Sequence, residues 1–394
     1  MTGDPPTAPF PSPSVLDEVI ELRRHFHRHP EVSFSEHQTS RRIGDRLQEL
    51  GLELKPCPTE TGVVAMLDTG RPGKTVMLRA DIDALPIHEE SGVDFASKTD
   101  GRMHACGHDA HMGIMVGVAR TLVDRIWDVS GRYLFVFQPA EEIVSGAKAM
   151  IAGGLLDDHH PDSVIGLHIT SFTESGTVIT RPGLLWAGSD AYQIDLAGPG
   201  GHGGMMGRRG NVVSAQAFLI EHLHTIVEGL EHDGVQCHTT VGNISSDGAW
   251  NIVPRGVSVK GSLRTFTAPL REEALGRLRD LLREVDTEFD VQSTLQLVHG
   301  TVPLMNDPNV TRTVLDVGRS IIGDKASVLG KPLTVSDDFA EFLTRIPGCY
   351  FMLGAMPEGG PPPSHHSPGF KIDENALGVG VKVLAGVAAR LASE

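Results

Sequence analysis

The sequence predicts an α/β protein in which a mostly parallel sheet is interrupted by a smaller α+β domain. Up to residue 188, short and almost wholly apolar segments alternate with helix-like segments, which is the pattern of buried parallel strands joined by helices. From 189 to 302 the segments instead alternate apolar and polar residues, as strands with one solvated face do. From 303 to 394 the first pattern returns. We therefore expect a main domain over 15–188 and 303–394, with an inserted domain over 189–302.

The first residues, 1–14, are rich in proline and contain neither a basic cluster nor a long apolar run. This composition predicts a disordered lead-in and argues against a secretory signal. From Ser14 to His29, apolar residues are spaced among charged ones, so an amphipathic helix is expected there. Pro30 ends this helix, because proline cannot continue it without losing a hydrogen bond.

The main domain continues with two predicted strands, 62–67 and 74–80, which a turn containing glycine and proline separates. A helix with small residues on one face is expected at 110–126. The near-continuous apolar run at 133–138 is typical of a strand inside a parallel sheet. A short helix and a further buried strand follow, at 146–152 and 163–168.

The inserted domain is predicted to contain strands of alternating polarity and two helices. The strands are expected at 192–198, 235–242 and 257–266, and the helices at 212–230 and 271–288. The returning α/β part is predicted to contain three helices and one strand. These are the helices at 309–322, 338–345 and 374–392 and the strand at 349–355.

Charge and composition argue against several kinds of protein. The chain has 34 Lys and Arg against 50 Asp and Glu, a formal charge of −16, which argues against nucleic-acid binding and a polybasic membrane anchor. No run of about 20 apolar residues is present, so we expect no transmembrane helix and no membrane partner. The four cysteines are widely scattered, which favours reduced thiols and a cytoplasmic location. Histidine occurs 19 times, partly in clusters, which is a first indication of metal binding.

Residues capable of chemistry follow the predicted strands. In open α/β sheets, ligands bind beyond the carboxyl ends of the strands. The groups at such ends are Asp81 and Asp83, the segment His104–His111, Glu141 with Glu142, His168, and later His365 with His366. Because these groups are far apart in the sequence, they indicate a site assembled by the fold rather than a zinc finger.

Cys106 and His108 are candidate metal ligands. A thiolate and an imidazole two residues apart in a glycine-containing loop can face one ion, and Cys, His and carboxylate are the usual ligands of zinc and similar metals. The alternative is that Cys106 is a small buried residue and His108 an ordinary loop histidine. The presence of His104, Asp109 and His111 in the same loop favours metal binding.

The adjacent acids Glu141 and Glu142 follow a hydrophobic strand. One can hold a metal while its neighbour takes a proton from water. The alternative is a solvated helix start, where acids are favoured by the helix dipole. His168 ends a buried strand, where a lone histidine is more often structural than a ligand. Asp81 and Asp83 could each be a ligand, an orienting residue or a turn residue, and Asp83 suits a carboxylate that fixes a histidine tautomer.

Several motifs occur together in one order. They are His27-Arg-His-Pro-Glu31, Leu78-Arg-Ala-Asp-Ile-Asp-Ala-Leu-Pro86, Met103-His-Ala-Cys-Gly-His-Asp-Ala-His111, Phe137-Gln-Pro-Ala-Glu-Glu142, Gly166-Leu-His168, Gly200-Gly-His202, Asn251-Ile-Val-Pro254, Gly261-Ser-Leu-Arg-Thr-Phe266 and His366-Ser-Pro368. In this combination the chain resembles the metal-dependent amidohydrolases that include hippurate hydrolases, N-acyl-amino-acid aminoacylases and plant auxin-conjugate hydrolases, relatives of carboxypeptidase G. The resemblance runs from about residue 15 to the C-terminus.

The resemblance implies a catalytic domain with two divalent metal ions, interrupted by a lid domain. It implies hydrolysis of the amide bond of small N-acyl amino acids, which releases a carboxylic acid and an amino acid. The ions would be zinc, manganese, cobalt or nickel. The ligands that it implies are Cys106, His108, Glu142, His168 and His366. A homo-oligomer is compatible with the sequence.

The resemblance also assigns roles to residues that do not hold metal. Glu141 would be the general base, and His202 in the lid would stabilise the oxyanion. Asn251 and Arg264 would bind the substrate carboxylate. Three segments depart from the usual family pattern, Ile143–Ser145, Gly203–Arg208 and Ser336–Phe339, and the second surrounds the region that would face the substrate.

Two other functions remain open at this point. One is a small-peptide carboxypeptidase or dipeptidase that uses the same two-metal site. The other is a metal-storing or ligand-binding protein that kept the fold. Glu141 argues against the second, because a binding protein has no use for a base that is not a ligand.

Overall fold

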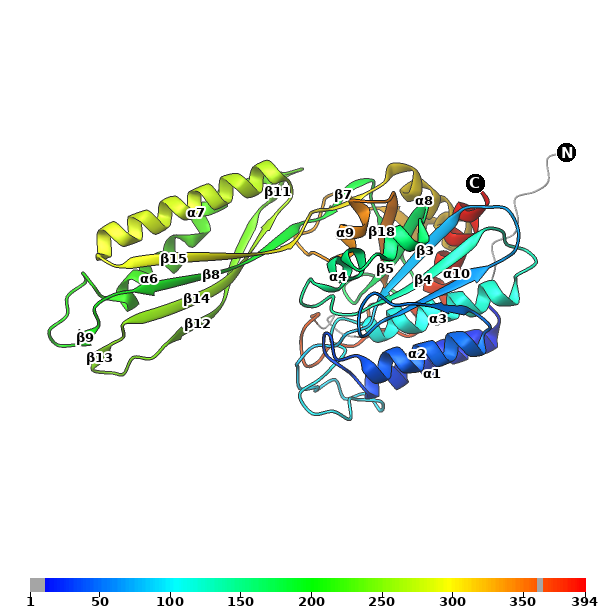
Figure 1. Cartoon of the computed structure of the whole chain (residues 1–394), viewed down its shortest axis with the longest axis horizontal. Coiled ribbons are helices and arrows are strands. Elements are labelled where there is room, and N and C mark those ends of the chain that lie inside the picture. Colours follow the sequence, from blue (N-terminus) through cyan, green and yellow to red (C-terminus); the bar gives the residue numbers. More distant parts are fainter. Residues whose placement is uncertain (1–10, 360–363) are drawn as a thin grey trace. The chain divides into compact units, whose positions relative to one another are not determined.

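The computed structural model describes residues 11–359 and 364–394 and divides into two compact units (Figure 1). The larger unit runs to Gly183 and continues over Met305–Gly330 and Asp338–Glu394. The smaller unit comprises Leu184–Leu304 and Lys331–Asp337. The expected lead-in over 1–14 lies mostly outside the described residues, and Pro13 and Ser14 already belong to the first helix.

The larger unit contains an eight-stranded sheet in the order β1-β2-β4-β3-β5-β18-β6-β17. The strands are β1 (Glu53–Lys55), β2 (Val63–Asp68), β3 (Thr75–Asp81), β4 (Arg132–Gln138), β5 (Ser163–Thr170), β6 (Val178–Thr180), β17 (Ala326–Val328) and β18 (Gly348–Gly354). The four central strands β4, β3, β5 and β18 run parallel, whereas β1 and β2 join one edge antiparallel. At the other edge β6 is antiparallel to β18 and β17 is parallel to β6. The predicted α/β class with a mostly parallel sheet is confirmed.

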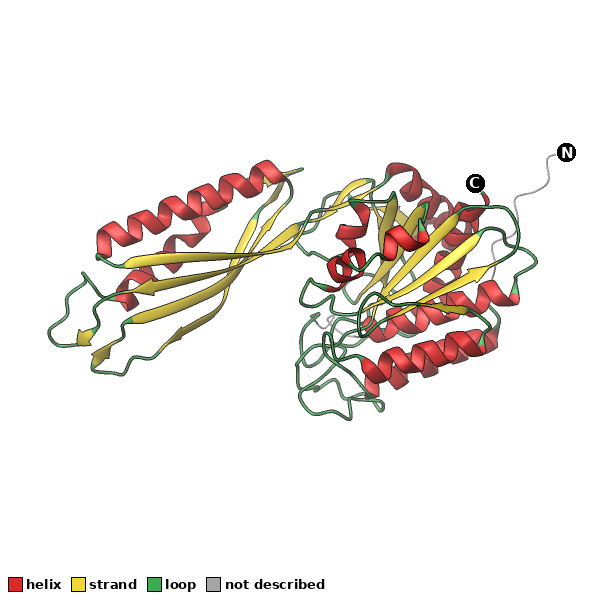
Figure 2. Ribbon diagram, viewed as in Figure 1, coloured by secondary structure: helices red, strands yellow, loops and turns green. Residues whose placement is uncertain are grey.

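Helices cover both faces of this sheet (Figure 2). They are α1 (Pro13–Arg28), α2 (His37–Glu49), α3 (His108–Asp124), α4 (Gly146–Ala152), α5 (Leu155–His159), α8 (Pro308–Ile322), α9 (Phe339–Leu343) and α10 (Asn375–Ser393). Helices α3, α8 and α10 pack with the core that contains Cys349 and Phe351 of β18. The intervening Tyr350 faces the opposite way and stacks on Phe339 of α9, with ring centroids 4.5 Å apart. Because both faces are covered, every residue of β3 and β18 is buried, which explains their near-continuous apolar sequences.

Two helices of the larger unit have compositions that their packing explains. Helix α2 has few apolar residues and was not predicted, yet its Ile43 and Leu47 are buried in the core. Helix α10 is long and apolar enough to cross a membrane by length and composition. However, 67% of its most apolar window is buried inside the protein, so packing in the core accounts for its composition.

The smaller unit is built around the antiparallel sheet β12-β14-β8-β15. Its strands are β8 (Gly188–Ala197), β12 (His238–Ser246), β14 (Gly256–Thr265) and β15 (Gln292–Thr301). Its helices are α6 (Val212–His222), the 3₁₀ turn Leu223–Ile226 and α7 (Ala268–Phe289). Leu275, Leu278 and Leu282 of α7 recur every three or four residues and are buried in a core separate from that of the larger unit. The hydroxyl of Thr267 accepts the Leu270 N–H and caps this helix.

Short strands complete the described part of the fold. They are β7 (Gly183–Trp186), β9 (Gly201–His202), β10 (Glu231–His232), β11 (Val235–Gln236), β13 (Ile252–Val253) and β16 (Leu304–Asn306). The helix expected at 212–230 ends at His222, and 3₁₀ geometry follows it. Lys331–Asp337 belongs to the smaller unit rather than to the second part of the main domain, because Leu333 hydrogen bonds to the backbone of Leu185 and Ala187.

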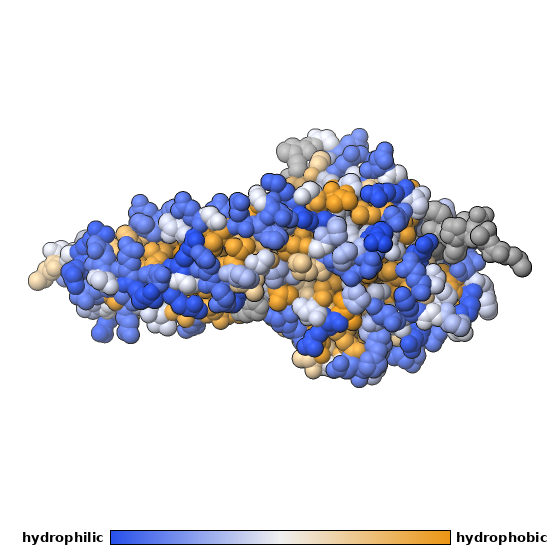
Figure 3. Space-filling view, turned by 90° about the horizontal axis from the view of Figure 1, so that it is seen from above, coloured by the Kyte–Doolittle hydropathy of each residue, from blue (hydrophilic) through white to orange (hydrophobic). Residues whose placement is uncertain are grey.

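Hydrophilic side chains alternate with hydrophobic ones over the visible face of the molecule (Figure 3). Several large apolar side chains are well exposed within the described residues, among them Trp127, Met205, Trp250 and Val298. Isolated exposed apolar residues are ordinary on protein surfaces and do not by themselves indicate a binding site.

Candidate metal centre

The carboxyl ends of the central parallel strands bring distant residues together in the larger unit. Glu141 and Glu142 follow β4, and His168 lies near the end of β5. Cys106 precedes α3, and His108 is its first residue. His366 follows β18, and its backbone N–H donates to the carbonyl oxygen of Ala105 at 2.9 Å. This bond ties the last candidate ligand to the loop that carries the first.

Gly107 allows Cys106 and His108 to face the same space. Its φ is +91°, a conformation that residues with a Cβ rarely adopt. A Cβ at this position would lie 2.4 Å from the Cγ2 atom of Ile169, so the site has no room for another residue type. With this turn in place, the Cys106 Sγ atom lies 3.4 Å from His168 Nε2.

Two of the groups of candidate ligand atoms share Cys106. One group is Cys106, His108 and His168, and the other is Cys106, Glu142 and His366. Within each group the ligand atoms lie within 4.8 Å of one another. Glu142 carboxylate oxygens lie 3.8 Å from His108 Nε2 and 3.4 Å from His366 Nε2. The structure therefore brings together all five residues that the sequence suggested as ligands.

Glu141 lies beside this cluster, with a carboxylate oxygen 4.0 Å from His108 Nε2. It is 8% exposed, so its carboxylate is close to the ligand atoms but still accessible. Glu141 also belongs to a group of candidate ligand atoms with His108 and Glu142, and its role as a base rather than a ligand stays a prediction.

The donors fit a divalent cation. His108 Nε2 and Glu142 Oε1 are buried and make no hydrogen bond within the described part of the chain, which is costly for polar atoms unless something else satisfies them. Thiolate, imidazole and carboxylate together are the ligand set of zinc and the later first-row metals. The His108 ring presents Nε2 to the cluster because its Nδ1 N–H donates to the backbone oxygen of Asp83 at 2.8 Å.

Protonation states in the absence of an ion follow from burial and neighbouring charge. Burial raises the pKa of the Cys106 thiol well above its usual value, and burial raises the pKa of Glu142 to about 7. Burial opposes a charge on His108, but Asp81 and Cys106 outweigh it and raise the pKa of His108. Burial, with a contribution from His111, lowers the pKa of His168. Binding of a cation should therefore displace protons from Cys106, His108 and Glu142.

A protein-family model described as peptidase family M20/M25/M40 matches residues 77–390, which is most of the chain. The chain belongs to this family. It is 35% identical over 361 residues to N-acetyl-L-cysteine deacetylase of Bacillus subtilis (strain 168), covering 91% of this chain and 85% of the relative. It is 34% identical over 372 residues to thermostable carboxypeptidase 2 of Saccharolobus solfataricus, covering 93% of each.

A solved structure agrees with the family assignment. The Bacillus subtilis YXEP protein, described as a dinuclear metal-binding peptidase of family M20, has a TM-score of 0.79 to this chain at 27% identity. The match covers 96% of this chain and 98% of that protein. The chain is accordingly an enzyme, a hydrolase that acts on amides, in a family with dinuclear-metal members.

In this M20 chain Asp83 makes more contacts than the sequence suggested. Its backbone oxygen accepts the His108 Nδ1 N–H, and its carboxylate lies 3.5 Å from the same nitrogen. The carboxylate also accepts the backbone N–H groups of Glu141 and Glu142, at 3.0 and 3.1 Å, and the Ser33 hydroxyl at 2.6 Å. Asp83 therefore orients the paired acids as well as the histidine.

Asp81 and His111 support the backbone next to the cluster of candidate ligands. The Asp81 carboxylate is 2.5 Å from His111 Nδ1, and His111 Nε2 accepts the Ile169 N–H at 2.9 Å. Both ring nitrogens of His111 are thus used, so it orients the backbone next to His168 rather than offering a ligand atom. The second Asp81 oxygen accepts from the fully buried Arg79 at 2.7 Å.

Sequence reasoning missed the network around Arg79. Its guanidinium also donates to Asp338 at 2.9 Å, to Gln138 at 2.8 Å and to the Tyr350 hydroxyl at 3.2 Å. Gln138 ends β4, Tyr350 lies in β18 and Asp338 precedes α9, so the network ties these segments to β3. The sequence did contain a signal for this network, an arginine inside an apolar predicted strand next to two aspartates in the Leu78–Pro86 motif. A charge buried in this way needs charged partners.

The other polar residues of the histidine-rich loop pack away from the ligand atoms. The Asp109 carboxylate accepts from Arg23 at 3.0 Å and is 2.9 Å from His27 Nδ1. Burial opposes a charge on His27, but attraction to Asp109 raises its pKa to about 9. His104 is 1% exposed, and burial lowers its pKa to about 4. The contacts of Asp109 with Arg23 and His27 anchor α1 to the start of α3, next to His108.

The remaining predicted site residues lie in the smaller unit. His202 is exposed on β9, which pairs with β13, and the Gly204 N–H donates to His202 Nδ1 at 3.1 Å. A neutral His202 must therefore carry its proton on Nε2 and can act as a donor there. The backbone oxygen of Asn251 accepts the Gly203 N–H at 2.9 Å, so Asn251 and His202 lie on the same small ladder. Arg264 of β14 hydrogen bonds to the Ser336 hydroxyl.

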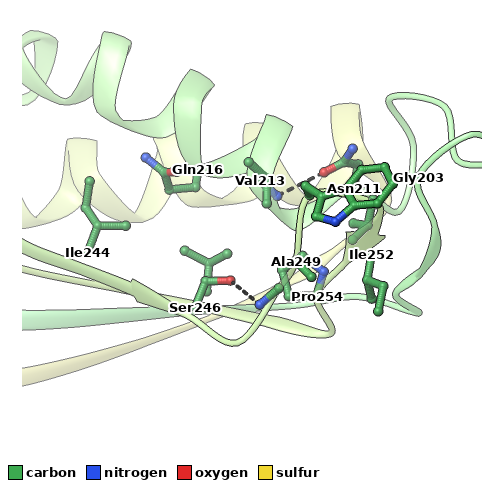
Figure 4. A pocket seen from close by; sticks show the side chains of 13 residues that line it. Gly203, Asn211, Val213, Gln216, Ile244, Ser246, Ala249, Ile252 and Pro254 are labelled. Carbon is green, nitrogen blue, oxygen red and sulfur yellow. Dashed lines mark hydrogen bonds between the residues drawn. The ribbon is translucent and has the colours of Figure 1, made fainter.

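A pocket of about 560 Å³ lies within the smaller unit (Figure 4). Val213 and Gln216 of α6 line one side, and Ile244 and Ser246 of β12 line the other. The pocket wall includes Gly203 but none of the metal-ligand candidates, so this pocket is distinct in composition from the metal cluster.

Replacing Cys106 should test the shared ligand. We expect Cys106→Ala to lower both the metal content and turnover, the latter by about 100-fold or more, because losing even an outer partner of a metal ligand costs 10–100-fold. Metal analysis of the purified variant and steady-state kinetics would measure this. Cys349→Ala is the matched control, because Cys349 is also buried but contacts Thr180 and Thr311. Normal metal content and turnover in Cys106→Ala would show that the ligand assignment is wrong.

Proposed function

We propose that this chain hydrolyses the amide bond of N-acyl amino acids, releasing a carboxylic acid and an amino acid. The observation that carries the proposal is the cluster of five ligand-type side chains beside Glu141 at the carboxyl edge of a parallel sheet. The relationship to an N-acetyl-L-cysteine deacetylase supports the acyl-amino-acid substrate class.

Two divalent ions would be held by Cys106, His108, Glu142, His168 and His366. Support comes from the two donor groups that share Cys106. Zinc, manganese, cobalt and nickel all suit these donors. When bound, such ions supply Lewis acidity that polarises the amide carbonyl and lowers the pKa of water.

Glu141 is the proton carrier in this proposal. Its carboxylate takes a proton from water as the water oxygen forms a bond to the amide carbon. It then gives that proton to the amide nitrogen as the carbon–nitrogen bond breaks, so the amine leaves and Glu141 returns to its starting state. Asp83 contributes by holding the backbone of both acids, which fixes the directions of their side chains.

The smaller unit acts as a lid in this proposal, and its residues complete the site when the lid closes. His202 would donate its Nε2 proton to the developing oxyanion, and the Gly204 N–H supports this role by selecting that tautomer. Asn251 and Arg264 would bind the carboxylate of the substrate. The separate hydrophobic core of this unit supports its movement as one compact body.

A cytoplasmic location accompanies this function. All four cysteines are free thiols, and three of them are buried. Such thiols persist in a reducing compartment, and Cys106 must stay reduced to serve as a ligand.

The second candidate is a carboxypeptidase that uses the same cluster, because thermostable carboxypeptidase 2 is a relative at 34% identity. A panel of substrates separates the two functions. We expect higher kcat/KM for N-acetyl and N-benzoyl amino acids than for dipeptides, measured as amino acid released. Faster release from dipeptides would favour the carboxypeptidase.

The matched control in this panel is the amide of each N-acyl amino acid, which lacks the carboxylate. We expect kcat/KM for it to be about 10- to 100-fold lower, since hydrogen bonds to charged groups are worth about 1.5–3 kcal/mol. Equal rates would remove the proposed role of Asn251 and Arg264.

A further inference from the structure

The turn that carries the paired acids has an unusual backbone. Ala140 and Val144 both have a φ of +54°, and neither is a glycine. This region is unfavourable for residues with a Cβ atom, so the surrounding structure must hold it. The turn closes tightly on itself, because Ser145 and Gly146 both donate their N–H groups to the Ala140 oxygen. A Cβ at Gly146 would lie 1.6 Å from the Pro139 oxygen.

Two buried carboxylates hold three successive N–H groups in this turn. The Glu36 Oε1 atom accepts the Ala140 N–H at 2.9 Å. The two Asp83 oxygens accept the N–H groups of Glu141 and Glu142. The directions in which the side chains of Glu141 and Glu142 leave the backbone therefore depend on contacts made just before them, at Ala140.

Glu36 is 0% exposed and lies at the start of α2, 104 residues before Ala140 in the sequence. Its other oxygen accepts the Thr61 hydroxyl at 2.8 Å. Both of these donors are neutral. Burying a carboxylate on neutral partners is costly, so stability alone is a weak reason for a glutamate at this place.

We infer that Glu36 is a positioning residue, which holds Ala140 in its left-handed conformation and thereby aims Glu141 and Glu142. The inference rests on the proposed function for the roles of the two acids. Glu36 itself touches neither the ligand atoms nor the substrate in this scheme, so it acts through the backbone of the turn.

The double-mutant cycle of Glu36 and Ala140 tests the inference. Glu36→Ala should lower kcat by about 10- to 100-fold, the usual cost of losing an outer supporting contact, with little change in KM. Ala140→Gly should be nearly neutral, because glycine adopts positive φ readily. In the Ala140→Gly background, Glu36→Ala should lower kcat by a factor about fivefold smaller than in the parent enzyme, because glycine adopts the left-handed conformation without a supporting contact. If the two substitutions act independently, so that their effects on kcat multiply in the double variant, the inference is wrong.

Hydrogen–deuterium exchange supplies a measurement that does not depend on activity. Exchange of the peptide spanning 139–146 should be faster in Glu36→Ala, and in Glu36→Gln, which keeps an oxygen for the Ala140 N–H, it should stay close to that of the parent. Unchanged exchange in Glu36→Ala would also overturn the inference. If Glu36→Ala does not fold, parent-like kcat and exchange in Glu36→Gln remain the expected result, and a loss as large as a removed base would contradict it.

Glu31→Ala is the matched control for Glu36→Ala. The Glu31 carboxylate likewise binds a backbone N–H and a hydroxyl, those of Thr39, at 2.8 and 2.9 Å, but it does not contact the turn. It should show no coupling to Ala140→Gly and no change in exchange over 139–146. If the parent enzyme hydrolyses no N-acyl amino acid, the proposed function fails, whereas the exchange comparison still decides whether Glu36 holds the turn.

Discussion

Glu141→Gln should abolish most turnover while leaving the metal in place. Glutamine is nearly isosteric with glutamate, so the ligand atoms beside it should keep their positions, but it cannot accept a proton from water. We expect kcat to fall by about 10²–10⁴-fold, the range for losing a general base, with full metal content and nearly unchanged substrate binding. Steady-state kinetics, metal analysis and binding of a slow substrate to the variant would measure these three quantities.

Glu142→Gln is the paired comparison, since the two residues are adjacent and Asp83 holds both of their N–H groups. This change should weaken metal binding, because it removes a charged ligand that lies 3.4 Å from His366 Nε2. Added metal should then restore part of the activity. If Glu141→Gln loses metal and Glu142→Gln keeps both metal and rate, the two roles are reversed.

Removing the metal should abolish activity and lower stability. The ligand atoms of five residues, from four separated segments of the chain, would lose their common partner, and buried atoms such as His108 Nε2 and Glu142 Oε1 would be left without one. Mass action predicts about 2.7 kcal/mol of lost stability for an ion that was present at 100 times its Kd. Dialysis against a strong chelator, followed by activity assays and thermal unfolding, would measure both effects.

Restoration with single metals would identify those that support catalysis, and zinc, manganese, cobalt and nickel are the ions to compare. Chelator saturated with metal beforehand is the control for direct effects of the chelator on the protein. Full activity after exhaustive dialysis, with no metal detected in the protein, would refute metal dependence.

The pattern of the sequence alone was sufficient for the class of fold and for most elements of the larger unit. The apolar runs before Asp81, at 133–138 and at 163–168 correspond to strands β3, β4 and β5, which are buried on both faces. Such runs report local burial directly, and chemistry-bearing residues after them are expected at one edge of a parallel sheet. Helix α2 escaped prediction because its buried face has few apolar residues and depends on packing.

The sequence by itself determined which residue types could form the metal site, through the order of its motifs and the strand that precedes each one. Only the tertiary structure decided how these residues meet, because periodicity carries no information about side-chain direction in turns. It places His366 beside the loop that carries Cys106, and the Asp83 carboxylate binds the backbone of the acid pair. Both ring nitrogens of His111 contact neighbouring residues, so His111 has a supporting role. The tertiary structure also revealed the buried contact between Glu36 and Ala140, which joins segments 104 residues apart. Contacts of this kind depend on backbone conformations such as a left-handed alanine, which is stable only when the rest of the fold holds it.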